Sequence, residues 1–185
     1  MQDLPTQKHD TFADYLDLPD DGNRYEIIHG VLHVTPAPTV SHQKVSARLH
    51  LLLAEWVRSR VGGELLYAPV DVHLTDDTNV QPDLLWIAPE RVSRLIGDRV
   101  RGAPDLVIEI LSPGTARRDR TIKRDLYAEH GVREYWLVDI SQARVTMLRL
   151  EGLGFVEQAS GSGETILESS LEGCLSLTPA RLFEQ

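Results

Sequence analysis

Glu109 is the residue whose setting most strongly suggests chemistry. It interrupts an otherwise apolar run, residues 106–111, that is rich in β-branched side chains and bounded by Pro104 and by the Ser112-Pro113-Gly114 turn signal. Such a short run is typical of a strand covered on both faces. A carboxylate buried there is costly unless a cation or several hydrogen-bond donors meet it. The sequence therefore predicts a metal site or an organised polar pocket around Glu109.

Asp83 is the better of two candidate partners for Glu109. The pair Pro-Asp occurs at 82–83 and again at 104–105. Asp105 lies four residues before Glu109 in the same strand, roughly 13 Å away at about 3.3 Å per residue. That separation is too large for a shared ion whose ligands lie at about 2.0–2.1 Å. Asp83 belongs to a second strand-like run, 80–87, and adjacent pairing would bring it beside Glu109, whereas Asp105 is expected to be a strand-entry or turn acid.

The ligand set expected around Glu109 suits Mg²⁺ or Mn²⁺. Two carboxylates, the backbone carbonyl of Ile110 and several waters supply the oxygen ligands that hard cations prefer. Such an ion can activate water for attack on phosphorus and stabilise the charge that develops. Gln81 precedes Asp83 by two residues, on the same face of a regular strand, and is a candidate contact for substrate or for a ligand water.

A basic segment follows the Glu109 strand and contains Arg117, Arg118, Arg120, Lys123 and Arg124. Its simplest explanation is a solvated helix face with Asp-Arg pairs. Its position directly after Glu109 favours a second explanation, in which the four arginines contact nucleic acid. The chain as a whole is acidic, with a formal net charge of -9 and a pI near 5.2, which counts against broad attraction to nucleic acid but not against a local basic surface.

Periodicity and turn signals predict alternating helices and strands. We expect a short helix at 11–18 with Thr11 as N-cap and Asp14 as its capping-box acid, and a longer helix at 41–60. A further helix is expected at 115–130, with Ile122 and Leu126 facing inward. The other expected elements are a hairpin of strands 25–28 and 31–34, strands 65–67, 70–74, 80–87, 106–111 and 134–140, a helical turn at 89–95, antiparallel strands 144–150, 155–159 and 165–168, and a terminal helix near 179–183.

These elements predict one α/β domain over residues 1–185, with a core at about 25–140 and a C-terminal antiparallel β extension at about 144–185. The strand-helix-strand unit around 115–130 is a crossover, so its two strands should be parallel members of one mixed sheet. The first ten residues lack the apolar stretch of a secretory signal, and no window is long and apolar enough for a membrane helix. Cys174 is the sole cysteine, which excludes an internal disulfide and suits the reducing cytoplasm.

Motifs spread from about Tyr25 to Asp139 carry a family resemblance. They are Tyr25-Glu26 before Gly30, His42 after Pro36 and Pro38, Gln81-Pro82-Asp83, the run 104–113, Asp119-Arg120, Lys123, Tyr127, and the run 131–136. This pattern resembles the PD-(D/E)XK nuclease superfamily, and more closely its Uma-two family of restriction endonucleases. The resemblance implies a restriction-endonuclease-like fold, a mixed β-sheet flanked by helices. It also implies a divalent metal, with Asp83 and Glu109 as ligands.

The chain departs from the superfamily pattern at Leu111, where a lysine would stand two residues after the acid. Lys123, on the following helix, is the expected substitute. Asp119, Lys123 and Tyr127 are spaced i, i+4, i+8 and share a helix face. The alternative is that Lys123 only pairs with Asp119 at the surface, where such a pair contributes little to stability.

Two other residues are secondary candidates for the site. Glu26 is a candidate for a further metal or water contact, as an equivalent acid is in some superfamily members, and an exposed strand acid is the alternative. His42, near a helix start, is more often a cap or packing residue than a ligand, and contact with phosphate is the other interpretation.

Three hypotheses for function remain open at this stage. The leading one is an endonuclease that hydrolyses DNA phosphodiester bonds with Mg²⁺ or Mn²⁺ and water, without a covalent intermediate. The second is a catalytically inactive module of the same fold, acting as a homodimer in binding or assembly, which the missing strand lysine and the acidic surface favour. The third is hydrolysis of a small-molecule phosphate ester. Nothing in the sequence names a target site.

Overall fold

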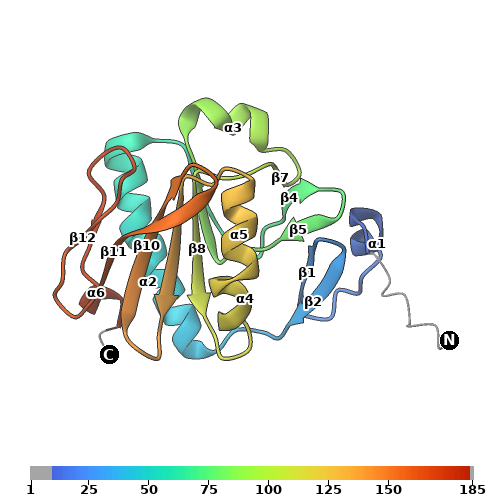
Figure 1. Cartoon of the computed structure of the whole chain (residues 1–185), viewed down its shortest axis with the longest axis horizontal. Helices are drawn as coiled ribbons and strands as arrows, with labels where there is room; N and C mark the ends of the chain where they lie inside the picture. The colour runs from blue at the N-terminus through green and yellow to red at the C-terminus, as the bar shows by residue number, and fades with distance from the viewer. Residues whose placement is uncertain (1–9, 184–185) are drawn as a thin grey trace.

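Two main sheets and one small sheet make up the fold of residues 10–183, which are the residues that the computed structural model describes (Figure 1). The six-stranded sheet has the order β11 (Gly154–Ser162), β10 (Arg144–Glu151), β9 (Glu134–Asp139), β8 (Leu106–Leu111), β6 (Leu84–Ile87) and β3 (Glu64–Tyr67). The five-stranded sheet has the order β2 (Val31–Thr35), β1 (Arg24–Ile28), β5 (Thr78–Val80), β4 (Val72–Thr75) and β7 (Val100–Arg101). The two-stranded sheet joins β12 (Leu167–Glu168) to β13 (Ser176–Leu177).

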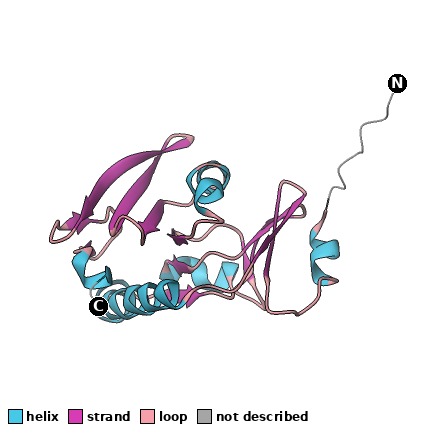
Figure 2. Ribbon diagram, turned by 90° about the horizontal axis from the view of Figure 1, so that it is seen from below, coloured by secondary structure: helices cyan, strands magenta, loops and turns pink. Residues whose placement is uncertain are grey.

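Helices cover both faces of the six-stranded sheet. The helices are α1 (Phe12–Leu16), α2 (Val40–Trp56) with the π-helical turn η1 (Val57–Val61), α3 (Pro89–Leu95), α4 (Ala116–Arg120), α5 (Ile122–Glu129) and α6 (Ala180–Phe183). Figure 1 shows α2 and α5 on opposite sides of this sheet. The hairpin β1–β2 with α1, and the C-terminal strands, lie at opposite ends of the molecule in both views (Figure 2).

The central strand β8 is buried along its whole length, as expected for a strand covered on both faces. Its even-numbered residues pack in one cluster with Leu49 and Leu53 of α2, and Val107 and Leu111 pack in another with Leu126 of α5. Because side chains alternate along a strand, Glu109 must face the α5 side. Each buried aliphatic side chain contributes about 1.5–3 kcal/mol to folding, so this register is strongly fixed.

The predicted crossover is confirmed, since β8 and β9 pair in parallel with Glu109 opposite Leu137. The short N-terminal helix with its Thr11–Asp14 capping box and the two-residue hairpin turn are also confirmed. In that turn His29 and Gly30 both have positive φ, 50° and 73°, the backbone that a tight hairpin of this type needs.

The predicted single mixed sheet is wrong, because the expected strand 80–87 is two strands in different sheets. β5 belongs to the five-stranded sheet and β6 to the six-stranded sheet, and Gln81-Pro82-Asp83 separates them. Pro82 has no N–H to donate to a ladder, which explains why the pairing stops there. Asp76 and Asp77 form the turn that joins β4 to β5.

The helical segment predicted at 115–130 is present, but it is not continuous. It is divided into α4 and α5 at Thr121, whose φ of -124° and ψ of -83° are not helical. The division turns Ile122 outward, to 43% exposure, whereas Leu126 is buried as expected. The longer helix predicted at 41–60 ends earlier as an α-helix, at Trp56, and η1 completes it before Gly62. The strand β13 was not predicted; it is only two residues long.

Glu134 ties the C-terminal segment to the central sheet. Its buried carboxylate accepts hydrogen bonds from Trp136 Nε1 at 2.8 Å and Ser169 Oγ at 2.6 Å, and from the N–H and Oγ of Ser170 at 2.7 and 2.8 Å. Replacing Glu134 with alanine leaves these donors without an acceptor, so we expect the free energy of unfolding to fall by about 3 kcal/mol.

Hydrogen exchange can locate the effect of Glu134→Ala. The amide of Ser170 should exchange faster in the variant, whereas the exchange rates of amides in β8 should change only as far as the global stability changes. Glu168→Ala, which removes an exposed carboxylate two residues before Ser170, is the matched control. Equal destabilisation by both variants would contradict the anchoring role of Glu134.

None of the helices formed by residues 10–183 combines the length and the hydropathy needed to cross a lipid bilayer.

Candidate active site

The antiparallel pairing of β6 with β8 brings Asp83 next to Glu109. Leu84 lies opposite Ile108, so the next residues along the two strands, Asp83 and Glu109, are neighbours. The backbone N–H of Ile110 donates to Asp83 Oδ2 at 2.8 Å, which fixes the carboxylate against β8. Asp83 and Glu109 both line a cavity of about 510 Å³. The expectation that these two acids converge from neighbouring strands is met.

Lys123 lies between the acids of this cavity. Its Nζ is 2.8 Å from Glu109 Oε1, 2.7 Å from Glu26 Oε1 and 3.9 Å from Asp119 Oδ1. The hydroxyl of Tyr127 donates to the same Glu109 oxygen at 2.9 Å. Lys123 and Asp119 are both buried, so the alternative of a surface pair is wrong. The lysine of α5 thus reaches the strand acid although Leu111 occupies the usual lysine position.

Asp83 is held by two further side chains. Arg24 of β1 donates from Nη1 to Oδ1 at 2.8 Å, and His42 of α2 places Nε2 3.2 Å from Oδ2. An ionised carboxylate only accepts hydrogen bonds, so Nε2 is the protonated ring nitrogen. Burial would raise the pKa of Asp83, but the hydrogen bond from His42 and the charge of Arg24 outweigh it and hold that pKa below its ordinary value. Asp83 is therefore ionised at neutral pH.

The pKa of Glu109 is shifted in the opposite direction. Burial raises its pKa to about 8, and the charges of Asp119, Asp83 and Glu26 add to that rise against the opposing charge of Lys123. Burial would also raise the pKa of Glu26. That pKa is nevertheless lowered overall by the charge and hydrogen bond of Lys123, the N–H of Gln81 and the charge of Arg118. Lys123 lowers the pKa of both acids, but Glu26 also has the Gln81 N–H and the charge of Arg118, whereas Glu109 has three acidic neighbours.

This raised pKa predicts how the stability of metal-free protein depends on pH. The folded chain holds a proton on Glu109 up to about pH 8, whereas the ordinary pKa is 4.5. The contribution of this group to stability is therefore complete below pH 4.5 and is lost as pH rises through 8. Between these limits the loss is up to about 5 kcal/mol.

Urea unfolding in EDTA at a series of pH values measures the loss, with Glu109→Gln as the reference that cannot ionise. The free energy of unfolding of the wild type, minus that of the variant, should fall as pH rises. A difference that stays flat, or that rises with pH, would show that Glu109 is ionised in the folded protein throughout.

The donor set of the cavity fits a hard divalent cation. Four carboxylates line it, those of Glu26, Asp83, Glu109 and Asp119, and Asp119 Oδ1 is buried without a hydrogen-bond partner. Among the described residues no three His, Cys, Asp or Glu side chains are grouped closely enough to hold an ion by themselves. A cation here would thus rely on few protein ligands and keep several waters, which is the usual behaviour of Mg²⁺.

Ile110 and Gln81 are placed as follows. The N–H of Ile110 donates to Asp83, and the role of its carbonyl as a metal ligand stays a prediction. Gln81 was expected to share a strand face with Asp83; the strand is interrupted between them, and both residues line a hollow of about 580 Å³. The Gln81 side chain donates to Tyr15 and Asp71, and its backbone N–H donates to Glu26 at 2.9 Å.

The predicted arginine cluster is divided in the structure. Arg118 lines the cavity, 3.4 Å from Glu26, and donates to Thr35. Arg120 pairs with Asp139 at 2.6 Å, and Arg124 donates to the carbonyl of Phe155. Arg117 is exposed and does not line the cavity. Arg118 is therefore the arginine of this group that is placed to meet a ligand in the cavity.

Arg24 and Asp119 are members of the site that the sequence did not identify as such. Arg24 precedes Glu26 by two residues, so both side chains lie on one face of β1, and this spacing was the available signal. Asp119 was noted as a motif residue and as a helix-face neighbour of Lys123, and not as a site residue; its burial follows from the packing of α4 against β8.

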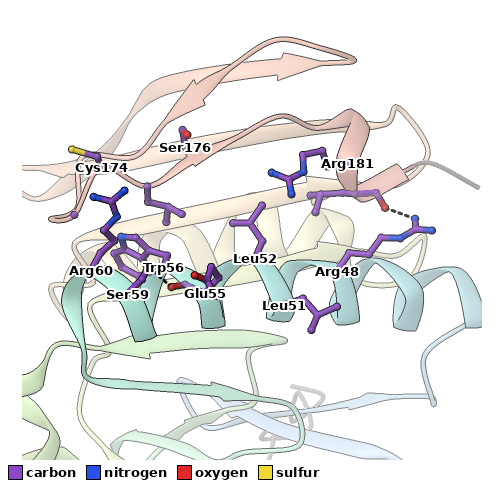
Figure 3. A pocket seen from close by; sticks show the side chains of 13 residues that line it. Arg48, Leu51, Leu52, Glu55, Trp56, Ser59, Arg60, Cys174, Ser176 and Arg181 are labelled. Atoms are coloured by element: carbon purple, nitrogen blue, oxygen red, sulfur yellow. Dashed lines mark hydrogen bonds between the residues drawn. The ribbon is translucent and has the colours of Figure 1, made fainter.

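A second hollow, of about 660 Å³, lies between α2 and the C-terminal segment (Figure 3). Arg48, Arg60 and Arg181 line it, and Glu55 is the one acid in its lining. Arg48 donates to the carbonyl of Leu182 at 2.7 Å, a bond drawn in Figure 3. Without a pair of carboxylates this hollow does not have the donors that a hard cation needs.

Comparison with known proteins identifies the family of this chain. Residues 12–180 match the model of the Uma2 (Uma-two) family, described as "Putative restriction endonuclease". A solved structure from Anabaena variabilis ATCC 29413, described as a "putative nuclease belonging to DUF820", matches with a TM-score of 0.74 and 21% identity, over 94% of this chain and 97% of that one. No curated protein matches. The structural match confirms the restriction-endonuclease-like fold, and the chain belongs to the Uma2 family.

Proposed function

We propose that this protein is a metal-dependent nuclease that hydrolyses phosphodiester bonds of DNA. The observation that carries the proposal is the buried cluster of Asp83, Glu109 and Lys123 at the wall of one cavity. Burying several carboxylates beside one lysine is unfavourable for stability alone, so a role in chemistry is the better explanation. Membership of a family described by nuclease activity supports the same reaction class.

The chain's own residues would have distinct roles. Asp83 and Glu109, with the carbonyl of Ile110, would hold Mg²⁺ or Mn²⁺, and such a cation, when bound, supplies Lewis-acid stabilisation of charge on phosphate oxygens. Lys123 keeps a positive charge beside Glu109, because its two carboxylate neighbours outweigh burial and raise its pKa. That ammonium can orient a water or offset developing negative charge. Tyr127 fixes the orientation of Glu109.

Cleavage of plasmid DNA tests the proposal. Supercoiled plasmid and circular single-stranded DNA should be cut with Mg²⁺ or Mn²⁺ and not with EDTA. Asp83→Asn, which keeps the shape of the side chain and removes its charge, should abolish cutting while circular dichroism stays native. Asp105→Asn removes a structural acid, which pairs with Arg91 at 2.7 Å and lies outside the cavity lining, and is the matched control.

The second hypothesis, an inactive module, predicts a different result in the same assay. DNA would be retained in a gel-shift measurement, and no metal would produce cleavage. If Asp83→Asn cleaves DNA at the wild-type rate, the proposed site is contradicted, and only the assignment of nuclease activity stands.

A further inference from the structure

Arg24 forms part of the wall between the candidate active site and a neighbouring hollow. It lines the cavity that contains Glu109 and also a hollow of about 580 Å³ that includes Tyr15 and Gln81. Its guanidinium donates to Asp83 Oδ1 at 2.8 Å, and Asp83 is its one hydrogen-bonded partner within residues 10–183. Space therefore exists on both sides of the guanidinium if it leaves Asp83.

The hydrogen bonds of Asp83 show where a cation would approach. Oδ2 already accepts from the Ile110 N–H and from His42, which uses the acceptor capacity of one carboxylate oxygen. Among the residues that the structure describes, Oδ1 accepts only from Arg24. A divalent ion would thus bind at Oδ1, at about 2.0–2.1 Å, and would repel the guanidinium that holds the same oxygen.

Arg24 is free to move in a way that Lys123 is not. The side chain of Arg24 is 19% exposed, whereas that of Lys123 is 3% exposed and lies between two carboxylates. If Arg24 leaves, Asp83 keeps its bonds from His42 and Ile110, and an incoming cation replaces the lost charge. Displacement therefore leaves no buried charge uncompensated.

We propose that Arg24 takes the place of the metal at Asp83 in the metal-free protein, and that a divalent ion displaces its guanidinium, which then binds a phosphate of the substrate. The inference rests on the proposed metal-dependent function. The planar guanidinium has a fork of donors that matches two phosphate oxygens, so it suits the second role. Metal binding and phosphate binding would then favour each other.

Calorimetric titration with MnCl₂ tests the first half of the proposal. Arg24→Gln should bind Mn²⁺ roughly tenfold more tightly than wild type, because the competing cation is gone. Arg118→Gln is the matched control, since it removes the same charge from the same cavity, beside Glu26 and not beside Asp83. Equal tightening by both variants, or no tightening in Arg24→Gln, would overturn the proposal.

Repeating the titration with sulfate, which mimics phosphate without precipitating Mn²⁺, tests the second half. Sulfate should tighten Mn²⁺ binding several-fold in wild type and not in Arg24→Gln, by reciprocity of coupled binding. Arg24→Lys keeps the charge but lacks the forked donors of the guanidinium, so sulfate should tighten its Mn²⁺ binding less than in wild type. This variant replaces Arg24→Gln in the test if Arg24→Gln does not fold. If sulfate tightens Mn²⁺ binding in either variant as much as in wild type, phosphate binding by Arg24 is contradicted.

The same titrations separate this inference from the proposed function. If wild type and both Arg24 variants bind no Mn²⁺, the metal-dependent function itself fails. If wild type binds Mn²⁺ and Arg24→Gln binds it with the same affinity, only the role of Arg24 is overturned.

Discussion

Glu109→Gln should reduce DNA cleavage by about a thousandfold or more while leaving the protein folded. The glutamine amide is nearly the same shape as the carboxylate, and its oxygen can still accept from Lys123 and Tyr127, which contact a single Glu109 oxygen. The negative charge that would attract a divalent cation is lost. Mn²⁺ affinity, measured by calorimetry, should therefore fall together with activity.

Stability distinguishes this loss from simple damage to the fold. Because burial raises the pKa of Glu109 to about 8, a neutral side chain suits the metal-free protein, and the variant should unfold at a urea concentration no lower than wild type at pH 8. Glu129→Gln, an exposed acid on α5, is the control and should change neither activity nor Mn²⁺ affinity. A folded Glu109→Gln variant that cuts DNA at the wild-type rate would remove Glu109 from the site.

Lys123→Met should produce the largest loss of stability among the site variants. The buried ammonium is the closest cation to Glu109 and Glu26, at 2.8 and 2.7 Å. Removing one member of a buried ionic cluster costs about 3–5 kcal/mol, because the remaining charges stay buried without compensation. Urea unfolding in EDTA measures the loss, and Lys44→Met, at an exposed position of α2, is the matched control.

Added Mn²⁺ should partly restore the stability of Lys123→Met, because a cation held by Asp83 and Glu109 offsets the same carboxylates. Cleavage should remain at least about a hundredfold below wild type, since no group replaces the ammonium at Nζ. Lys123→Arg keeps the positive charge and tests whether that charge must lie at the position of Nζ. This variant should be more stable than Lys123→Met and should still cut DNA slowly. Wild-type stability and activity in Lys123→Met would show that the lysine is a passive neighbour.

The sequence predicted the central part of the fold because its signals there are local. The apolar run around Glu109, the crossover to the next strand and the capping box at Thr11 each depend on residues close together in the chain. Turn residues with positive φ, such as Gly30 and Gly131, mark element ends that periodicity alone leaves vague.

The errors arose where tertiary pairing decides the structure. Residues 80–87 were expected to be one strand although Gln81-Pro82-Asp83 interrupts their apolar pattern, and Pro82 was a local signal for the break; the assignment of the two halves to different sheets depends on tertiary pairing. The division of α4 from α5 at Thr121 has no strong local signal, since threonine is tolerated in helices. Two-residue strands such as β13 contain too few residues for any period to be recognised.

The sequence predicted Asp83, Glu109 and Lys123 as site residues, and it missed Arg24 and Asp119. Asp83 and Glu109 stand out because carboxylates in buried runs are rare, and the family resemblance directed attention to Lys123. Arg24 lies 59 residues from Asp83 in sequence, so only the pairing of β1 with β5, the strand that leads to Asp83, reveals their ion pair. Conversely, Arg120 and Arg124 belong to the conspicuous basic segment but are occupied by contacts within the protein.

A crystal soaked in Mn²⁺, with anomalous diffraction recorded near the manganese edge, tests the central claim most directly. We predict one strong peak in the cavity, at about 2.0–2.2 Å from an oxygen of both Asp83 and Glu109, with the Arg24 guanidinium moved away from Asp83. A soaked crystal with no peak between these two acids, and with Arg24 still bound to Asp83, would contradict it.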